Sequence, residues 1–161
     1  MNPPSWSVPP SNVLQLNVDA ALKDGVATLA VVVRNDMGHF INGWAKKVET
    51  TDPATAEAAA LLWALEIAVE NKFTKIVVEG DAKLCIDAIT IETTSIPWRI
   101  HSLVHSIKVL AFEFSVCSFC WVRRDANGVA HSLTKFASSL NSCFSCNSSN
   151  LPPSLRTRGL D

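Results

Sequence analysis

The segment VATLAVVVRND, residues 26–36, is the part of the sequence that most constrains the fold. It is a nearly continuous apolar run rich in β-branched residues, which is typical of a β-strand covered on both faces. The neighbouring segments also predict strands, because residues 13–22 alternate apolar and polar positions and residues 39–48 follow a turn. Three successive strands with short connections indicate an antiparallel meander.

After residue 50 the pattern changes to helices that alternate with strands. Residues 54–72 favour a helix by propensity, and the preceding Thr-Asp-Pro offers N-cap chemistry. We then expect a strand at 75–81, helices at 82–90 and 98–114, a strand at 114–124 and a last helix at 126–140. The order β-β-β-α-β-α-α-β-α predicts an α/β fold with a mixed five-stranded sheet and helices on both faces.

The length and composition predict one domain at residues 13–140, a proline-rich linker at 1–12 and a weakly ordered, serine-rich tail at 141–161. Glu66 interrupts the longest apolar stretch, so we expect no membrane segment. The first residues have neither a basic start nor an apolar core, so we expect no secretory signal. From five cysteines and no extracellular context, we expect reduced thiols and an intracellular protein, nuclear or cytoplasmic and not secreted. We also expect a monomer.

The charge balance gives no support to a nucleic-acid function. Fourteen Lys and Arg residues stand against fifteen Asp and Glu residues, for a net charge of −1. Nucleic-acid-binding domains often have a clear basic excess. Any such function must therefore rest on the local chemistry of a site.

Three acidic residues stand where the pattern predicts apolar neighbours. Asp19 follows an alternating strand, and Asp81 lies at the switch from a strand to a helix. On a helical wheel Glu57 falls within about 60° of Leu61 and Ala64, inside the apolar arc. Each acid also has a structural explanation: a turn or cap for Asp19, the helix dipole for Glu57 and an N-cap for Asp81.

Taken together, the three acids indicate a shared site. They come from the first strand, the first helix and the fourth strand, and they meet if the two strands are neighbours and the helix crosses them. Three converging carboxylates repel one another unless a divalent metal neutralises them. Oxygen ligands suit Mg²⁺ or Mn²⁺, and two such ions about 3.5–4 Å apart can support phosphodiester cleavage.

The sequence resembles the type 1 ribonuclease H family, and most closely the plant ribonuclease-H-like domains related to retroelement reverse transcriptases. The resemblance covers residues 13–137 in the family's order. The stretches that carry it are LNVDAA, VVVRNDMGHFINGWA, TAEAAALLWAL, VVEGDAKLCIDAI and WVRRDANGVAHSLTKFA. It implies a three-layered fold around a five-stranded sheet, in a chain that is part of a longer reverse-transcriptase-related polypeptide.

The resemblance also implies an activity, namely hydrolysis of the RNA strand of an RNA–DNA hybrid by two Mg²⁺ (or Mn²⁺) ions. The family's metal-binding and catalytic carboxylates correspond to Asp19, Glu57 and Asp81, and its fourth catalytic position corresponds to His131. We assign contacts with the nucleic acid to three residues of the same segment: Arg123, Arg124 and Asn127.

His131 is the main departure from the family. The closing helix of the family reads Asn-x-x-Ala-Asp-x-Leu-Ala, and His131 takes the place of its aspartate. Imidazole prefers softer metals than Mg²⁺, and Asp125 is an alternative donor six residues upstream. Three hypotheses follow: a hydrolase impaired at its second metal, a non-catalytic module that binds hybrids or other nucleic acid, or a retroelement-derived remnant.

The cysteines offer an alternative metal site. Cys117 and Cys120, like Cys143 and Cys146, have the CxxC spacing of a zinc site. The first pair lies in a predicted strand, where residues three apart point to opposite faces. We therefore expect free or buried thiols and no structural zinc.

Other residues with possible ligand chemistry have simpler explanations. His101 and His105 are one helical turn apart and could pair at a metal, but no third ligand accompanies them, so we expect a solvated helix face. Most tryptophans are candidates for the core. Trp44 and Trp98 are the two that we consider for stacking on a nucleic-acid strand.

Overall fold

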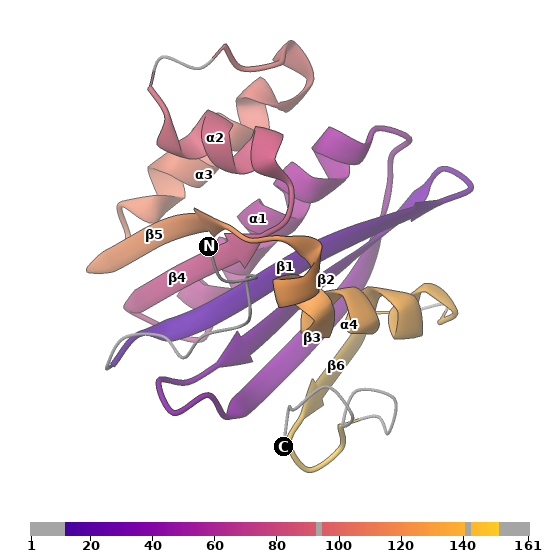
Figure 1. The fold of residues 1–161 in the computed structure, drawn as a ribbon, viewed down its shortest axis with the longest axis vertical. Coiled ribbons are helices and arrows are strands. Elements are labelled where there is room, and N and C mark those ends of the chain that lie inside the picture. The colour runs from indigo at the N-terminus through magenta and orange to yellow at the C-terminus, as the bar shows by residue number, and fades with distance from the viewer. Residues whose placement is uncertain (1–11, 93–94, 141–142, 152–161) are drawn as a thin grey trace.

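The structure of the chain, a computed structural model, describes residues 12–92, 95–140 and 143–151 (Figure 1). Its centre is a six-stranded mixed sheet with the order β5-β4-β1-β2-β3-β6. The strands are β1 (Leu14–Lys23), β2 (Val26–Arg34), β3 (Phe40–Glu49), β4 (Lys75–Gly80), β5 (Val116–Trp121) and β6 (Phe144–Asn147). The predicted α/β fold with a mixed sheet is confirmed.

The sheet has an antiparallel half and a parallel half that share β1. Strands β1, β2 and β3 form the predicted meander, and β6 adds to β3 in the antiparallel sense. On the other side of β1, β4 and then β5 pair in parallel. Parallel neighbours point their carboxyl ends to the same edge of the sheet, which brings the end of β4 beside the middle of β1.

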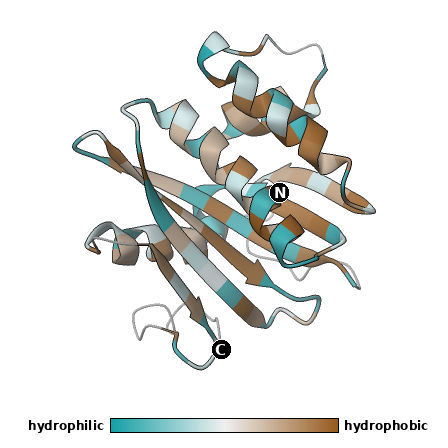
Figure 2. Cartoon of the chain, turned by 180° about the vertical axis from the view of Figure 1, so that it is seen from behind, coloured by the Kyte–Doolittle hydropathy of each residue, from teal (hydrophilic) through white to brown (hydrophobic). Residues whose placement is uncertain are grey.

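Helices cover both faces of the sheet, as predicted. Helix α4 crosses the face turned to the viewer in Figure 1, and the other three helices lie on the face seen in Figure 2. The helices are α1 (Pro53–Glu70), α2 (Lys83–Thr90), α3 (His101–Ala111) and α4 (Gly128–Ser138). Two short 3-10 turns precede α3 and α4: η1 (Trp98–Ile100) and η2 (Arg124–Asn127).

The continuous apolar run of β2 is explained by these two layers. Leu29, Val31 and Val33 belong to the larger core, which α1, α2 and α3 cover. Ala30 and Val32 point the other way, into a smaller core under α4. All five side chains are at most 1 % exposed, so this central part of β2, residues 29–33, needs apolar residues facing both layers.

Helix α1 lies close to the sheet because small residues form its inner face. Ala60, Ala64 and Ala68 are fully buried. The helix starts at a predicted cap, where Asp52 accepts a hydrogen bond from the backbone N–H of Thr55 at 3.0 Å. None of the described helices, this one included, has the length and apolarity needed to cross a lipid bilayer.

The structure corrects the number of strands from five to six. Strand β6 lies in the segment for which we expected a weakly ordered tail, and it pairs with β3. Its four residues, FSCN, are too few and too polar for a periodic signal, and β6 gains its place through Cys146, which is 2 % exposed and packs beside Gly43. Residues 1–11 of the expected linker, and 141–142 and 152–161 of the expected tail, lie outside the described residues.

We expect Leu133→Ala to lower the free energy of unfolding by about 2–5 kcal/mol, because Leu133 is a fully buried residue of α4 in the smaller core. Leu84→Ala is the matched control. Leu84 is 47 % exposed, and substitutions at such surface positions usually change stability by about 0.5 kcal/mol or less. Chemical denaturation of both variants measures the difference, and equal losses would contradict the packing of α4 on the sheet.

Candidate functional site

Asp19, Glu57 and Asp81 meet at one point. One ligand oxygen from each carboxylate lies within 4.8 Å of the other two. The pairing of β1 with β4 ends at Asn17 and Glu79, two residues before Asp19 and Asp81. The backbone ladder therefore stops just before the two aspartates, and Glu57 joins them from α1. This confirms the predicted convergence of the three acids, to which we refer as the acidic cluster.

The position of Asp81 depends on its neighbours on both sides. Gly80 allows β4 to approach β1 closely, because a Cβ atom at this position would lie 3.2 Å from Cγ2 of Val18. On the other side, the indole N–H of Trp121 in β5 donates a hydrogen bond to the backbone carbonyl of Asp81 at 3.2 Å. Trp121 is not among the site residues that the sequence predicts, because this contact depends on the pairing of β4 with β5.

The structural explanations for the aspartates fail. Strand β1 continues to Lys23, so Asp19 lies within the strand, opposite Ala30, rather than at a turn or cap. Asp19 is only 1 % exposed. Helix α2 has Ala82 at its N-cap position and no side-chain cap, so Asp81 does not cap it.

Burial and mutual repulsion change the proton affinity of the cluster. Burial, followed by the negative charges of Asp19 and Asp81, raises the pKa of Glu57 to about 9. The same causes, burial first and then the charge of Asp19, raise the pKa of Asp81. At neutral pH Glu57 therefore keeps a proton in the metal-free protein. A cation that binds to the ionised cluster must displace this proton.

The acidic cluster fits a divalent metal of the Mg²⁺ or Mn²⁺ type. Its donors are carboxylate oxygens, which hard cations prefer. Oxygens on opposite sides of a Mg²⁺ ion lie about 4.2 Å apart, so the largest separation of 4.8 Å closes with a small inward movement. Among the described residues, this is the only group of three or more acids, histidines or cysteines that could hold a metal ion.

His131 faces Asp19 from the first turns of α4. Its Nδ1 lies 3.2 Å from Oδ2 of Asp19, and its side chain is 28 % exposed. Thr134, one turn further along α4, places its hydroxyl 3.1 Å from the same carboxylate oxygen and 2.7 Å from the carbonyl of His131. Sequence reasoning missed Thr134, although its spacing of three residues from His131 places both on one face of the helix.

Arg124 lies at the mouth of the cluster. Its Nη2 is 2.8 Å from Nδ1 of His131, and its Nη1 is 4.0 Å from Oδ2 of Asp81. A guanidinium donates hydrogen bonds but cannot accept them. Nδ1 of His131 can therefore accept from Arg124 or donate to Asp19, but it cannot do both. The acidic cluster thus has a cationic neighbour that the sequence analysis did not assign to it.

The residues predicted to contact nucleic acid differ in their exposure to solvent. Asn127 is 1 % exposed, and its side chain is bonded within the domain. Its amide donates to the carbonyl of Val18 at 2.7 Å and accepts from Asn17 at 3.1 Å, which ties the start of α4 to β1 beside Asp19. Arg123 and Arg124 are both exposed, as a contact with a ligand requires.

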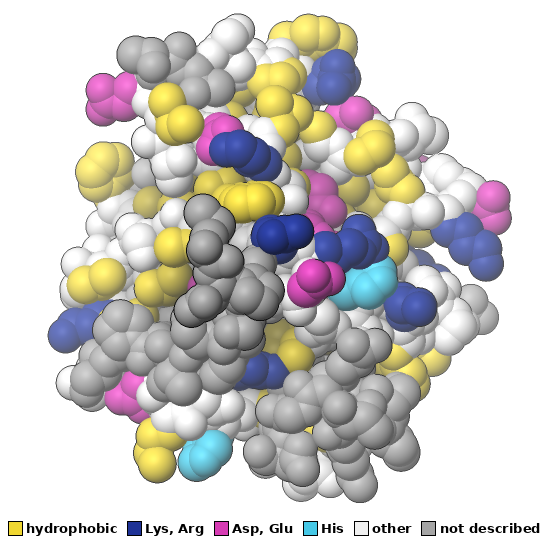
Figure 3. All heavy atoms as spheres, viewed as in Figure 1, with side chains coloured by type: hydrophobic (Ala, Val, Ile, Leu, Met, Phe, Trp, Pro, Cys, Tyr) yellow, Lys and Arg dark blue, Asp and Glu magenta, His cyan; other side chains and the backbone are white. Residues whose placement is uncertain are grey.

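Glu57 of the acidic cluster lines a surface cavity of about 400 Å³. The cavity is lined by Glu57, Arg124, the end of β1 and the first turn of α1. On the α4 side, Figure 3 displays basic side chains beside acidic side chains and a histidine near the start of α4. The site therefore combines a negative interior with positive charge at its rim.

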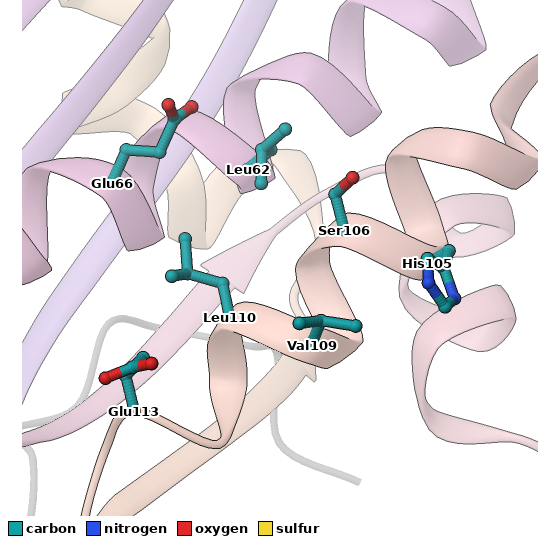
Figure 4. Close-up of a pocket in the computed structure, with 7 residues that line it drawn as sticks. All are labelled: Leu62, Glu66, His105, Ser106, Val109, Leu110 and Glu113. Atoms are coloured by element: carbon teal, nitrogen blue, oxygen red, sulfur yellow. The ribbon is translucent and has the colours of Figure 1, made fainter.

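The alternative ligand pairs belong to no group of three or more potential metal ligands among the described residues. All five cysteines are free. His105 lines a surface pocket between α1 and α3, at the end away from the carboxylates of Glu66 and Glu113 (Figure 4). Trp44 packs partly buried against the larger core, whereas Trp98 is 83 % exposed.

The fold is similar to that of several solved ribonucleases H. RNase H1 from the halophilic archaeon Halobacterium salinarum has a TM-score of 0.73 and 22 % identity, over 78 % of this chain and 97 % of that chain. LC11-RNase H1, isolated from compost and solved with an RNA/DNA hybrid, has a TM-score of 0.66 and 19 % identity, over 78 % and 99 % of the two chains. The foamy viral protease-reverse transcriptase, also solved with an RNA/DNA hybrid, has a TM-score of 0.63 and 13 % identity, over 79 % and 20 %.

Sequence comparison gives a family but no curated relative. The comparison with curated proteins finds no significant match. A family model described as reverse transcriptase-like matches residues 17–137, a span that contains the acidic cluster, Arg124 and His131. The chain therefore belongs to the reverse transcriptase-like family, with a ribonuclease H-like fold.

Proposed function

We propose that the chain is a metal-dependent endonuclease that hydrolyses the RNA strand of RNA–DNA hybrids, with Asp19, Glu57 and Asp81 as its metal ligands. The observation that carries this proposal is the convergence of three carboxylates within 4.8 Å, with Glu57 among them lining a surface cavity. Structural relatives solved with RNA/DNA hybrids support the choice of substrate. The metal is Mg²⁺ or Mn²⁺, because all the ligands are carboxylates.

The residues around the cluster have separate roles in this proposal. Thr134 and Asn127 hold Asp19 and its strand in position, and Trp121 holds the backbone of Asp81. Glu57 gives up its proton when the cation binds. Arg124 is exposed beside the cavity, where it can pair with a phosphate of the substrate. A bound divalent ion would supply Lewis acidity and lower the pKa of an attacking water.

We further infer that the domain at residues 13–140 acts within a longer reverse-transcriptase-related polypeptide, of the plant retroelement-related group. The match of residues 17–137 to the reverse transcriptase-like family model supports the relation to reverse transcriptases. We propose that the domain is monomeric and acts inside the cell, in the nucleus or cytoplasm. The proposed compartment rests on the cysteine content of the sequence, as described above.

A second candidate function is a non-catalytic module that binds RNA–DNA hybrids. The observation that favours it is the contact between His131 and Asp19, together with Arg124 above them. A cationic or neutral group in the place of a fourth carboxylate removes a ligand from the metal site. Binding of a hybrid then survives while cleavage is slow or absent.

Cleavage of an end-labelled RNA–DNA hybrid, with Mg²⁺ and Mn²⁺ in parallel, tests the proposed function. We expect cuts in the RNA strand only, and none in double-stranded RNA or double-stranded DNA. Asp81→Asn should abolish the cuts, because it removes a metal ligand, whereas Asp125→Asn makes the same charge change at an exposed residue outside the cluster. Hybrid binding without cleavage by either metal would support the non-catalytic module instead.

Metal binding should raise the melting temperature, since the cation binds the folded state and relieves the repulsion within the cluster. We expect this rise with millimolar Mg²⁺ or Mn²⁺, and expect Asp81→Asn to reduce it. Differential scanning fluorimetry measures both, with Asp125→Asn as the control. No shift for the wild type with either metal would count against a metal site.

The stability of the metal-free protein should depend on pH through Glu57. The folded pKa of Glu57 is about 9, against a usual value of 4.5. As pH rises through this window, the unfolded chain loses the proton that the folded state retains, so the wild type loses stability. We therefore expect the Tm of Glu57→Gln, relative to wild type, to increase between pH 5 and pH 9 in a chelator. Glu66→Gln, exposed on the same helix, is the control; a constant difference would contradict the buried acid.

His131→Asp should increase Mg²⁺-dependent cleavage, because it provides a carboxylate beside Asp19. A missing charge-stabilising group commonly costs about 10²–10³ in rate, so recovery of a measurable part of this range is expected. Initial rates in Mg²⁺ and in Mn²⁺ give the comparison. A folded His131→Asp variant that still does not cleave would favour the non-catalytic module.

A further inference from the structure

Arg124 contacts two residues of the site, His131 and Asp81, although its side chain is exposed. Its guanidinium bridges two components of the site, with Nη2 at 2.8 Å from His131 and Nη1 at 4.0 Å from Asp81. The backbone fixes this position, because η2 begins at Arg124 and ends at Asn127, which is buried and bonded to β1. Arg124 is therefore anchored through its own turn, although its side chain is 64 % exposed.

The charges of the cluster match one divalent ion and one guanidinium. Three ionised carboxylates carry three negative charges, and Arg124 and one divalent ion together carry three positive charges. A second divalent ion would leave an excess of positive charge in a partly buried site. Charges of one sign at such distances repel strongly where water is scarce.

The space beside Asp19 also disfavours a second divalent ion. A second ion would lie about 3.5–4 Å from the first and would need a further donor next to a shared carboxylate. On the α4 side of Asp19 that position belongs to His131, whose Nδ1 is 3.2 Å from Oδ2 of Asp19. The lone pair of this ring nitrogen points to Arg124 whenever Arg124 donates to it, so it is then not available to a metal.

We propose that the guanidinium of Arg124, positioned against His131 and Asp81, is a built-in counter-cation of the acidic cluster, so that this chain binds one divalent ion where the two-metal arrangement needs two. The inference rests on the proposed metal site of Asp19, Glu57 and Asp81 and defines its stoichiometry. In this role Arg124 acts on the metal through the charge of the cluster. The proposal also treats His131 and Arg124 as one unit. His131 takes the space beside Asp19, and Arg124 supplies the positive charge that a second ion would bring.

Titration of the metal-free, full-length chain with Mn²⁺ tests this proposal, by calorimetry and by the paramagnetic resonance signal of the free ion. We expect one ion per chain for the wild type. Arg124→Ala should still bind one ion, with an affinity about fivefold to tenfold higher, because a positive charge near the ion is gone. Arg123→Ala is the matched control: it removes the same charge from the adjacent residue, which is also exposed. The double variant Arg124→Ala/His131→Asp should bind two ions.

Each outcome decides a separate point. Two ions in the wild type would overturn the inference and leave the proposed metal site intact, whereas no binding at all would overturn both. Equal affinities for Arg124→Ala and Arg123→Ala would exclude Arg124 as a specific counter-cation. A double variant that binds only one ion would show that these two residues do not exclude the second. Thermal melting of each variant verifies that it is folded.

Discussion

A carboxylate inside a β-sheet is the constraint on which the site depends. Asp19 is 1 % exposed in β1, with paired strands on both sides of its strand, and an ionised group in such a place needs compensation. Part of it comes from the far end of the sequence, because the hydroxyl of Thr134 in α4 donates to Oδ2 of Asp19 at 3.1 Å. Helix α4 is thus both a covering layer of the sheet and the source of the partners that Asp19 requires.

Much of the fold follows from periodicity in the sequence. Residues 29–33 of β2 are all apolar because α1 and α4 cover opposite faces, and this run can be recognised without knowledge of distant contacts. Strand β6 could not be predicted in this way. It has four residues and a polar composition, and it is a strand only because β3 offers an edge and Gly43 leaves room for Cys146. Such a strand depends on its partner rather than on its own sequence.

The site, too, could be predicted from the sequence only in part. The acids could be found because each breaks a local pattern, and Glu57 in particular lies on the alanine side of α1. Arg124 could not be assigned to them, because its reach depends on η2 and on the burial of Asn127 against Val18. An asparagine in a loop-like segment suggests a ligand contact. Only the packing of that segment reveals that the amide serves the strand instead.

The two cores on opposite faces of the sheet divide the molecule into regions of unequal local stability. The larger core includes α1, α2 and α3, while the smaller one joins α4 and β6 to the strands through far fewer buried side chains. Native proteins open in cooperative units, and the unit with fewer buried contacts opens at lower free energy. The backbone amides of α4 should then exchange with solvent hydrogen sooner than those of α1. Because Asp19 lies between the two regions, transient detachment of α4 would expose its carboxylate while the rest of the domain stays folded.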